Sequence, residues 1–183
     1  MKDNNQMSDL VGLGCIHVIS GDGKGKTTSS LGLALRAAGH GFKTIMIQFM
    51  KKGWDYGELK AVELLPNVQI IQYGTPDFVD KEQPLPIDYQ EAKAALKRFI
   101  EELRSDEWDI IILDEVNVAL DYKLISEETI IKELKNKPKN IEIVLTGRNA
   151  SQSLIDLADY YTKVESIKHP YEQKIIARKG VEF

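Results

Sequence analysis

Cysteine, histidine and long apolar runs are all scarce in this chain of 183 residues. Cys15 is the only cysteine, which excludes a disulfide within the chain, and its place at the start of an apolar strand predicts a packed thiol rather than a reactive one. The three histidines show no spacing typical of a metal site. No apolar stretch is long enough for a signal peptide or a membrane span, so the sequence predicts a cytoplasmic protein with no membrane partner.

Clusters of positive charge are missing as well. The formal net charge is -4 and no basic run is longer than Lys51-Lys52, which argues against nucleic acid as a partner. With 43% apolar residues, the chain can bury one sizeable core. We therefore expect one α/β domain over residues 15–183. It is preceded by a flexible arm, residues 1–14, that either frays or orders against a ligand or a partner subunit.

Strand and helix patterns alternate along the chain. Strands are predicted over residues 15–20, 44–49, 68–73, 109–113 and 141–145. Helices are predicted after the first strand as far as Gly39, and over residues 88–104, 126–136 and 151–158. Residues 160–183 suggest one or two edge strands. This alternation predicts a three-layer α/β fold with a mostly parallel sheet and helices on both faces.

A glycine-rich turn joins the first strand to the first helix. Its glycines, Gly21, Gly23 and Gly25, allow the backbone N–H groups and the helix N-terminus to converge on an anion. Lys26 adds a positive charge, and Thr27 adds a hydroxyl suited to a magnesium ion. The turn therefore matches the phosphate-binding loop G-x-x-x-x-G-K-[ST], as in P-loop NTPases, except that a serine stands at the first glycine position.

An acidic pair follows the most apolar of the predicted strands. Asp114 and Glu115 come directly after residues 109–113. In a chain with a phosphate loop, two carboxylates at the carboxyl end of a buried strand indicate the Walker B position. We expect Thr27, Asp114 and Glu115 to hold Mg²⁺ or Mn²⁺, since hydroxyl and carboxylate oxygens suit these ions.

Further polar and aromatic residues follow the other strands, at the sheet edge where ligands of α/β proteins bind. Gln48 ends the second strand, and Trp54 and Tyr56 lie in the loop after it. The two aromatic residues fit a binding site and local packing equally well. Arg148 follows the fifth strand, where it either reaches a phosphate or a carboxylate of a ligand or forms a salt bridge on the surface.

Several of these motifs together resemble the ATP:corrinoid adenosyltransferases of the cobalamin pathway. The resemblance covers residues 14–183 and rests on the segments Gly21-Asp22-Gly23-Lys24-Gly25-Lys26-Thr27-Thr28, Gln48-Phe49 with Lys51, Trp54 and Gly57-Glu58, Leu113-Asp114-Glu115, Thr146-Gly147-Arg148, Lys168-His169 and Gly180-Val181-Glu182. Each motif is short, but their combination is specific. The phosphate loop of that family is shifted in a similar way.

The resemblance implies transfer of the 5'-deoxyadenosyl group of ATP to the cobalt(I) of a corrinoid, in cobalamin biosynthesis or salvage, with release of tripolyphosphate. Cobalt supplies the electrons, so the protein contributes positioning and electrostatic stabilisation of the leaving group rather than a nucleophile. The family also implies a homodimer and an electron donor such as a flavoprotein. For this reaction we expect Lys26 and Glu115 to act in catalysis, residues 21–28 and Arg148 to bind ATP, and Gln48, Trp54 and Phe78 to lie on the corrinoid side.

Two positions depart from the pattern of that family. Asp22 stands where many relatives carry asparagine, which places a carboxylate beside the expected phosphates. Relatives also carry a phenylalanine and a tryptophan two residues apart in the loop after the third strand, whereas residues 74–79 here contain Phe78 alone. Either Phe78 serves alone or the corrinoid is held differently.

Other functions fit parts of the sequence. The phosphate loop and the acidic pair alone also match a small-molecule kinase or NTPase, which yields ADP instead of tripolyphosphate. An ATP-gated switch that binds a partner protein is disfavoured, because Gly21 stands where the loop of such proteins carries a second lysine. A GTP-specific switch is disfavoured too, since residues 136–139 lack the aspartate of the N-K-x-D pattern.

Overall fold

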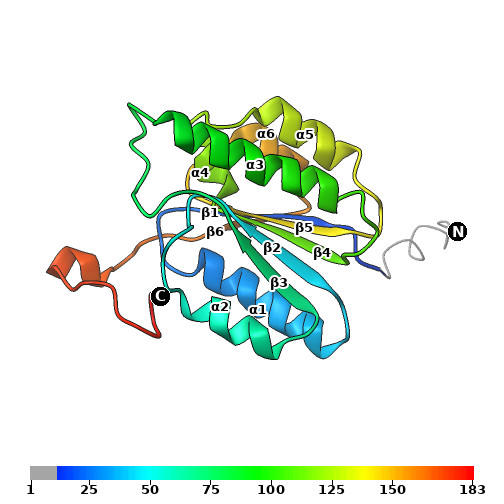
Figure 1. Ribbon diagram of the computed structural model, residues 1–183, viewed down its shortest axis with the longest axis horizontal. Coiled ribbons are helices and arrows are strands. Elements are labelled where there is room, and N and C mark those ends of the chain that lie inside the picture. Colours follow the sequence, from blue (N-terminus) through cyan, green and yellow to red (C-terminus); the bar gives the residue numbers. More distant parts are fainter. Residues whose placement is uncertain (1–11) are drawn as a thin grey trace, which may run out of the picture.

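The structure is a computed structural model that describes residues 12–183 (Figure 1). The predicted arm, residues 1–14, lies almost entirely outside the described residues. None of the helices in residues 12–183 has the length and apolar character needed to cross a membrane.

Six strands form one sheet in which all neighbours run parallel. They are β1 (Ile16–Ser20), β2 (Thr44–Gln48), β3 (Val68–Gln72), β4 (Ile110–Asp114), β5 (Glu142–Gly147) and β6 (Tyr160–Lys163). Their spatial order is β3-β2-β4-β5-β1-β6. Because all strands point the same way, the phosphate loop after β1 and the acidic pair at the end of β4 meet at one edge, with β5 between them.

Helices cover both faces of this sheet, which confirms the predicted three-layer α/β fold (Figure 1). One face carries α1 (Lys26–Gly39) and α2 (Gly57–Ala61). The other carries α3 (Pro86–Glu102), α4 (Val116–Asp121), α5 (Glu127–Lys135) and α6 (Gln152–Leu157). Two single 3₁₀ turns, Val62–Leu64 and Pro170–Gln173, complete the regular structure of residues 12–183.

The hydrophobic core is split by the sheet into two layers. Ile111 and Leu113 of β4 pack into the layer below α3 to α6, whereas Ile110 and Ile112 pack into the layer that contains Ala34 of α1. This alternation follows from the two-residue period of a strand. Since β4 is buried on both faces, the carboxylate at its end is delivered into the interior of the protein.

The helix boundaries follow the local capping chemistry. The hydroxyls of Ser126 and Ser151 accept hydrogen bonds from the N–H groups of Thr129 and Leu154, both at 3.3 Å, which confirms the predicted starts of α5 and α6. Helix α3 begins at Pro86, two residues earlier than predicted. Proline suits the first helical position, and Asp88 sits at the third, where its carboxylate accepts the N–H of Leu85, the residue before the helix, at 2.8 Å.

Two helices differ from the sequence-based expectation, whereas the C-terminal region contains an edge strand as expected. The sequence did not indicate α2 or α4, which are five and six residues long and too short for a clear helical period. Residues 160–183 form one edge strand, β6, and then a segment that extends beyond the carboxyl edge of the sheet (Figure 1).

Candidate active site

The register of the sheet places polar side chains of three strands in one row. Gln72, Gln48 and Asp114 are paired neighbours at the carboxyl ends of β3, β2 and β4. Gln72 Nε2 donates to Gln48 Oε1 at 2.9 Å, and Gln48 Nε2 donates to Asp114 Oδ2 at 3.1 Å. Gln48, predicted on the corrinoid side, has no exposed surface, so the structure makes it a support for the Asp114 carboxylate.

Asp114 is fully buried and accepts hydrogen bonds from four side chains. Its Oδ1 atom accepts from Thr27 at 2.9 Å and from Thr146 at 2.7 Å, and its Oδ2 atom forms an ion pair with Lys51 at 2.7 Å in addition to the Gln48 bond. Burial alone would raise the pKa of Asp114, but the Lys51 ammonium and the hydrogen bonds hold it below its ordinary value. Asp114 is therefore ionised and firmly oriented.

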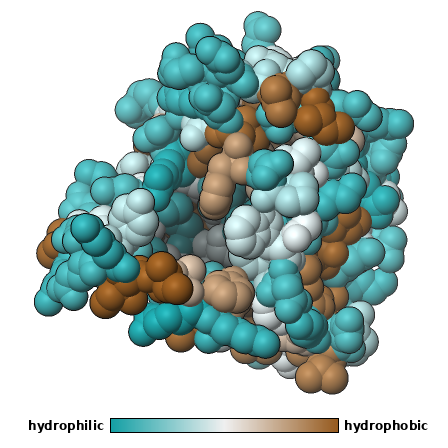
Figure 2. Space-filling view, turned by 60° about the vertical axis from the view of Figure 1, so that its left-hand side comes forward, coloured by the Kyte–Doolittle hydropathy of each residue, from teal (hydrophilic) through white to brown (hydrophobic). Residues whose placement is uncertain are grey.

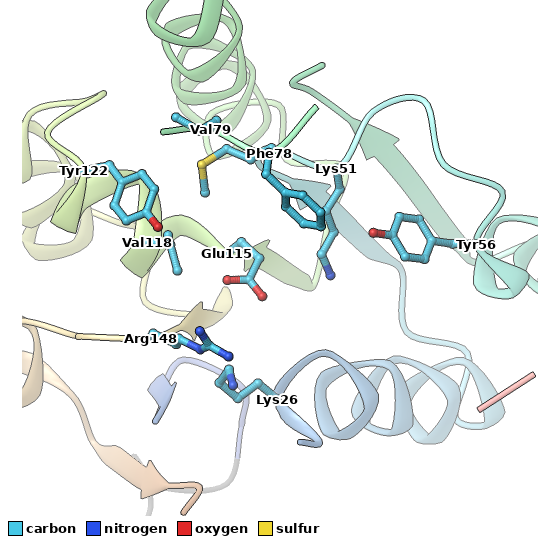
Figure 3. A pocket seen from close by; sticks show the side chains of 10 residues that line it. Lys26, Lys51, Tyr56, Phe78, Val79, Glu115, Val118, Tyr122 and Arg148 are labelled. Carbon is cyan, nitrogen blue, oxygen red and sulfur yellow. The ribbon is translucent and has the colours of Figure 1, made fainter. Parts of the chain in front are cut away.

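Glu115 is held in a different way from its neighbour. Its backbone is left-handed, with φ of 62°, and its N–H donates to Thr146 Oγ1 at 3.0 Å. A non-glycine residue in this conformation carries strain that is common at functional sites. The Glu115 carboxylate accepts no hydrogen bond from residues 12–183 and points into the cavity together with Lys26 and Arg148 (Figure 3). Burial and the charge of Asp114 raise the pKa of Glu115.

The phosphate loop presents unused donors. The N–H groups of residues 24–28 donate to no atom of the described chain, because they lie at the N-terminus of α1. The Lys26 ammonium donates to Gly23 O at 2.8 Å, and burial lowers the pKa of this lysine. A cavity of about 230 Å³ is lined by the loop together with Glu115 and Arg148. Free N–H groups beside two cations are the arrangement that binds a polyphosphate.

Gly21 and Gly23 have a second role that the sequence did not reveal. Gly21 has φ of 129°, and a side chain there would meet Val164 O at 2.1 Å. The Gly23 N–H donates to that same carbonyl at 3.0 Å, and Asp22 Oδ1 accepts the Ser166 N–H at 3.2 Å. This last hydrogen bond is the main cause of the lowered pKa of Asp22. The unexpected carboxylate thus binds the segment after β6.

The C-terminal tail, residues 180–183, also reaches the loop. Lys24 Nζ donates to Val181 O at 2.7 Å. The tail, Thr28 and Tyr56 line a cavity of about 300 Å³ next to the phosphate loop. The sequence did contain a signal for this tail, because Gly180-Val181-Glu182 is one of the motifs that resemble the family. No role was assigned to this motif from the sequence.

The cavity at the carboxyl edge, about 380 Å³ in volume, has a charged side and an apolar side (Figures 2 and 3). The charged side chains come from Lys26, Lys51, Glu115 and Arg148. The rest of the lining is largely apolar and aromatic and comprises Met50, Tyr56, Phe78, Val79, Val118 and Tyr122. The sequence missed Val118 and Tyr122, because it did not indicate α4.

Phe78 and Trp54 meet at the rim of this cavity. Their ring centroids are 5.9 Å apart with the planes tilted by 42°, and Trp54 Nε1 donates to Pro76 O at 2.8 Å. The Phe78 side chain is 92% exposed, so its stacking face is available to a ligand. The structure brings together the predicted residues Lys26, Thr27, Asp114, Glu115 and Arg148 and places Phe78 and Trp54 beside them.

Comparisons with known proteins agree on one family. The family model described as "ATP:corrinoid adenosyltransferase BtuR/CobO/CobP" matches residues 13–183. A corrinoid adenosyltransferase of Sinorhizobium sp is 36% identical over 93% of this chain and 80% of its own length. The corresponding values are 32%, 93% and 84% for a corrinoid adenosyltransferase of Pseudomonas aeruginosa, and 30%, 93% and 86% for corrinoid adenosyltransferase CobA of Salmonella typhimurium.

Proposed function

Because this chain belongs to the ATP:corrinoid adenosyltransferase family, we propose that it transfers the 5'-deoxyadenosyl group of ATP to the cobalt(I) of a corrinoid and releases tripolyphosphate. One observation carries this proposal. The family match spans the described chain, and within it the free N–H groups of the phosphate loop share a cavity with Glu115 and Arg148.

The leaving group explains why the site is so rich in donors. The cobalt(I) electron pair forms the bond to the 5' carbon as the bond from that carbon to the α-phosphate oxygen breaks, so negative charge grows on that oxygen. The loop N–H groups, Lys26 and Arg148 stabilise this charge electrostatically. No side chain needs to act as a nucleophile, and precise placement of ATP against cobalt supplies the remaining rate enhancement.

Thr27, Asp114 and Glu115 fit a divalent cation, Mg²⁺ or Mn²⁺. The described residues contain no group of three His, Cys, Asp or Glu side chains able to hold a metal alone. This agrees with an ion that takes most of its ligands from phosphates and water. The Glu115 carboxylate lacks a hydrogen-bond donor in the described chain, so it is available as a ligand. The bound cation would neutralise charge on the triphosphate.

The apolar side of the cavity suits the corrinoid. Phe78, Val118 and Tyr122 offer apolar and aromatic surface to a large planar ring. Trp54, from a separate loop, places a second aromatic ring beside Phe78, where residues 74–79 lack the tryptophan expected from the family. A homodimer, a flavoprotein as electron donor, a cytoplasmic location and a single domain over residues 15–183 stay predictions from the sequence.

The test is anaerobic incubation of the protein with ATP, magnesium and chemically reduced cobalamin. We expect an absorption spectrum with the features of an alkylcobalt bond that light destroys, and tripolyphosphate in amounts equal to the alkylated product. Formation of ADP without an alkylcobalt product would instead identify a kinase or an NTPase and would overturn the proposal.

A further inference from the structure

Lys51 lies at the centre of the site. Its ammonium is 2.7 Å from Asp114 Oδ2 and 3.0 Å from Thr27 Oγ1. These two side chains come from β4 and from the first turn of α1, and Thr27 Oγ1 also donates to the other oxygen of Asp114 at 2.9 Å. Lys51 therefore bridges the hydroxyl of the phosphate loop and the first Walker B carboxylate.

Thr27 and Asp114 are two of the three side chains, with Glu115, to which the proposed function assigns the divalent cation. A phosphate loop uses its threonine hydroxyl and the carboxylate after the buried strand for this purpose. A magnesium ion and the Lys51 ammonium cannot occupy the space between Thr27 and Asp114 together, because two cations at such a short distance repel each other strongly.

Asp114 explains why a cation is needed there at all times. The carboxylate has no exposed surface, and an unpaired charge in such a position is costly. Lys51 supplies the opposite charge, and accordingly its pKa is raised by Asp114 and Glu115 despite the opposing effect of burial. The ion pair keeps the empty site stable.

Lys51 is also able to leave. Its backbone is fixed, since the N–H donates to Tyr73 O at 2.9 Å, but its side chain is long, flexible and 14% exposed. It lines both the 380 Å³ cavity and the cavity beside the C-terminal tail, and its ammonium lies 5.6 Å from the centre of the Tyr56 ring. Figure 3 shows the side chain extending between Glu115 and Tyr56.

We propose that the Lys51 ammonium is an internal substitute for the divalent cation, which holds the Thr27–Asp114 position until the metal arrives with the nucleotide and then moves away. The inference rests on the metal site of the proposed function. When the divalent cation replaces the Lys51 ammonium, its two positive charges balance the two carboxylates of Asp114 and Glu115. The ammonium is then free to face the triphosphate in the cavity.

Manganese binding in the absence of nucleotide tests this exchange. Wild type, Lys51→Met and Lys52→Met would be titrated with Mn²⁺, and free Mn²⁺ would be measured by electron paramagnetic resonance. We expect Lys51→Met to bind Mn²⁺ about tenfold more tightly than wild type or better, because the competing charge is gone. Lys52 is exposed and pairs with Glu91 at 3.7 Å, so Lys52→Met should match wild type. Equal or weaker binding by Lys51→Met would overturn the proposal.

Thermal unfolding provides a second readout. Without metal, Lys51→Met should melt below wild type, and millimolar magnesium should restore most of the loss while it shifts wild type little. If Lys51→Met folds only with magnesium present, that result supports the same conclusion, and Lys51→Arg, which keeps the charge, should fold without it. A loss that magnesium does not restore would mean that Lys51 is a permanent ion-pair partner.

Neither measurement uses a corrinoid or turnover. The test of the cation exchange is therefore independent of the test of adenosyl transfer, and either proposal can fail while the other holds.

Discussion

Two strands of the parallel sheet carry a buried carboxylate, one at each end of the sheet, and the two carboxylates are satisfied in different ways. At the carboxyl end, all hydrogen bonds to the Asp114 carboxylate come from side chains. At the amino end, Glu142 of β5 accepts the backbone N–H groups of Gly14 at 2.6 Å and Cys15 at 2.8 Å, and it pairs with His17 at 2.5 Å. The Asp114 carboxylate is thus held by side chains, which can move, whereas the Glu142 carboxylate is held mainly by the backbone just before β1.

The difference separates function from stability. Backbone donors cannot be exchanged without unfolding β1, so Glu142 fastens that strand to β5. Asp114 has a lysine partner that borders a cavity and an ionisable neighbour, Glu115, without a hydrogen-bond donor in the described chain. The cavity beside Glu142 is larger, about 560 Å³. The volume of a cavity is therefore a poorer guide to the active site than a buried carboxylate whose hydrogen-bond partners can be exchanged.

The largest expected effect is on turnover, from changes at the carboxyl end. Lys26→Ala and Glu115→Ala should each lower kcat about a thousandfold or more, because each removes a group that stabilises or positions the charged leaving group. Both variants should keep the circular dichroism spectrum of wild type. Lys93→Ala, at an exposed position of α3, is the control and should leave kcat unchanged. Undiminished activity in either site variant would contradict the assignment.

The reverse pattern is expected at the amino end. Glu142→Ala should lower the free energy of unfolding by about 2 kcal/mol, since it leaves two N–H groups without their acceptor. Its kcat should stay close to that of wild type. Urea unfolding and steady-state kinetics measure the two quantities, with the exposed Glu107→Ala as control. A loss of turnover as large as that of Glu115→Ala would break the distinction between the two ends.

Acid should remove the contribution of Glu142 to the free energy of unfolding. Burial opposes ionisation of Glu142, but the His17 contact and the two N–H groups lower its pKa below the ordinary value of 4.5. A lowered pKa in the folded state means that the stabilisation is complete above pH 4.5 and is lost as the pH falls through the folded-state pKa. The difference in unfolding free energy between wild type and Glu142→Ala should therefore shrink as acid is added. A difference that persisted would point to packing instead.

The sequence was informative wherever the signal was local. The phosphate loop, the acidic pair and the strands before them are contiguous motifs, and the structure places Lys26, Thr27, Asp114 and Glu115 together as those motifs predicted. The capping serines of α5 and α6 are local signals of the same kind.

Contacts between distant segments could not be predicted in this way. Lys51 and Asp114 are 63 positions apart, and their contact depends on β2 lying beside β4, which no periodicity reveals. Asp22 binds Ser166 across 144 positions for the same reason. Gln48 was expected on the corrinoid side, and its hydrogen bond to Asp114 likewise depends on β2 lying beside β4.

The smallest effect is expected at the rim of the cavity at the carboxyl end, where the Phe78–Trp54 pair lies. At the amino end, His17 and Tyr160 stack with their ring centroids 4.4 Å apart. Phe78→Ala should raise the KM for the corrinoid about fivefold, because an aromatic stacking surface worth roughly 1 kcal/mol is lost, and should leave the KM for ATP unchanged. Stability should not change, since the side chain is 92% exposed. The exposed Leu64→Ala, in the turn after α2, serves as control for loss of an apolar surface group. Equal effects on both substrates, or none on either, would show that Phe78 does not contact the corrinoid.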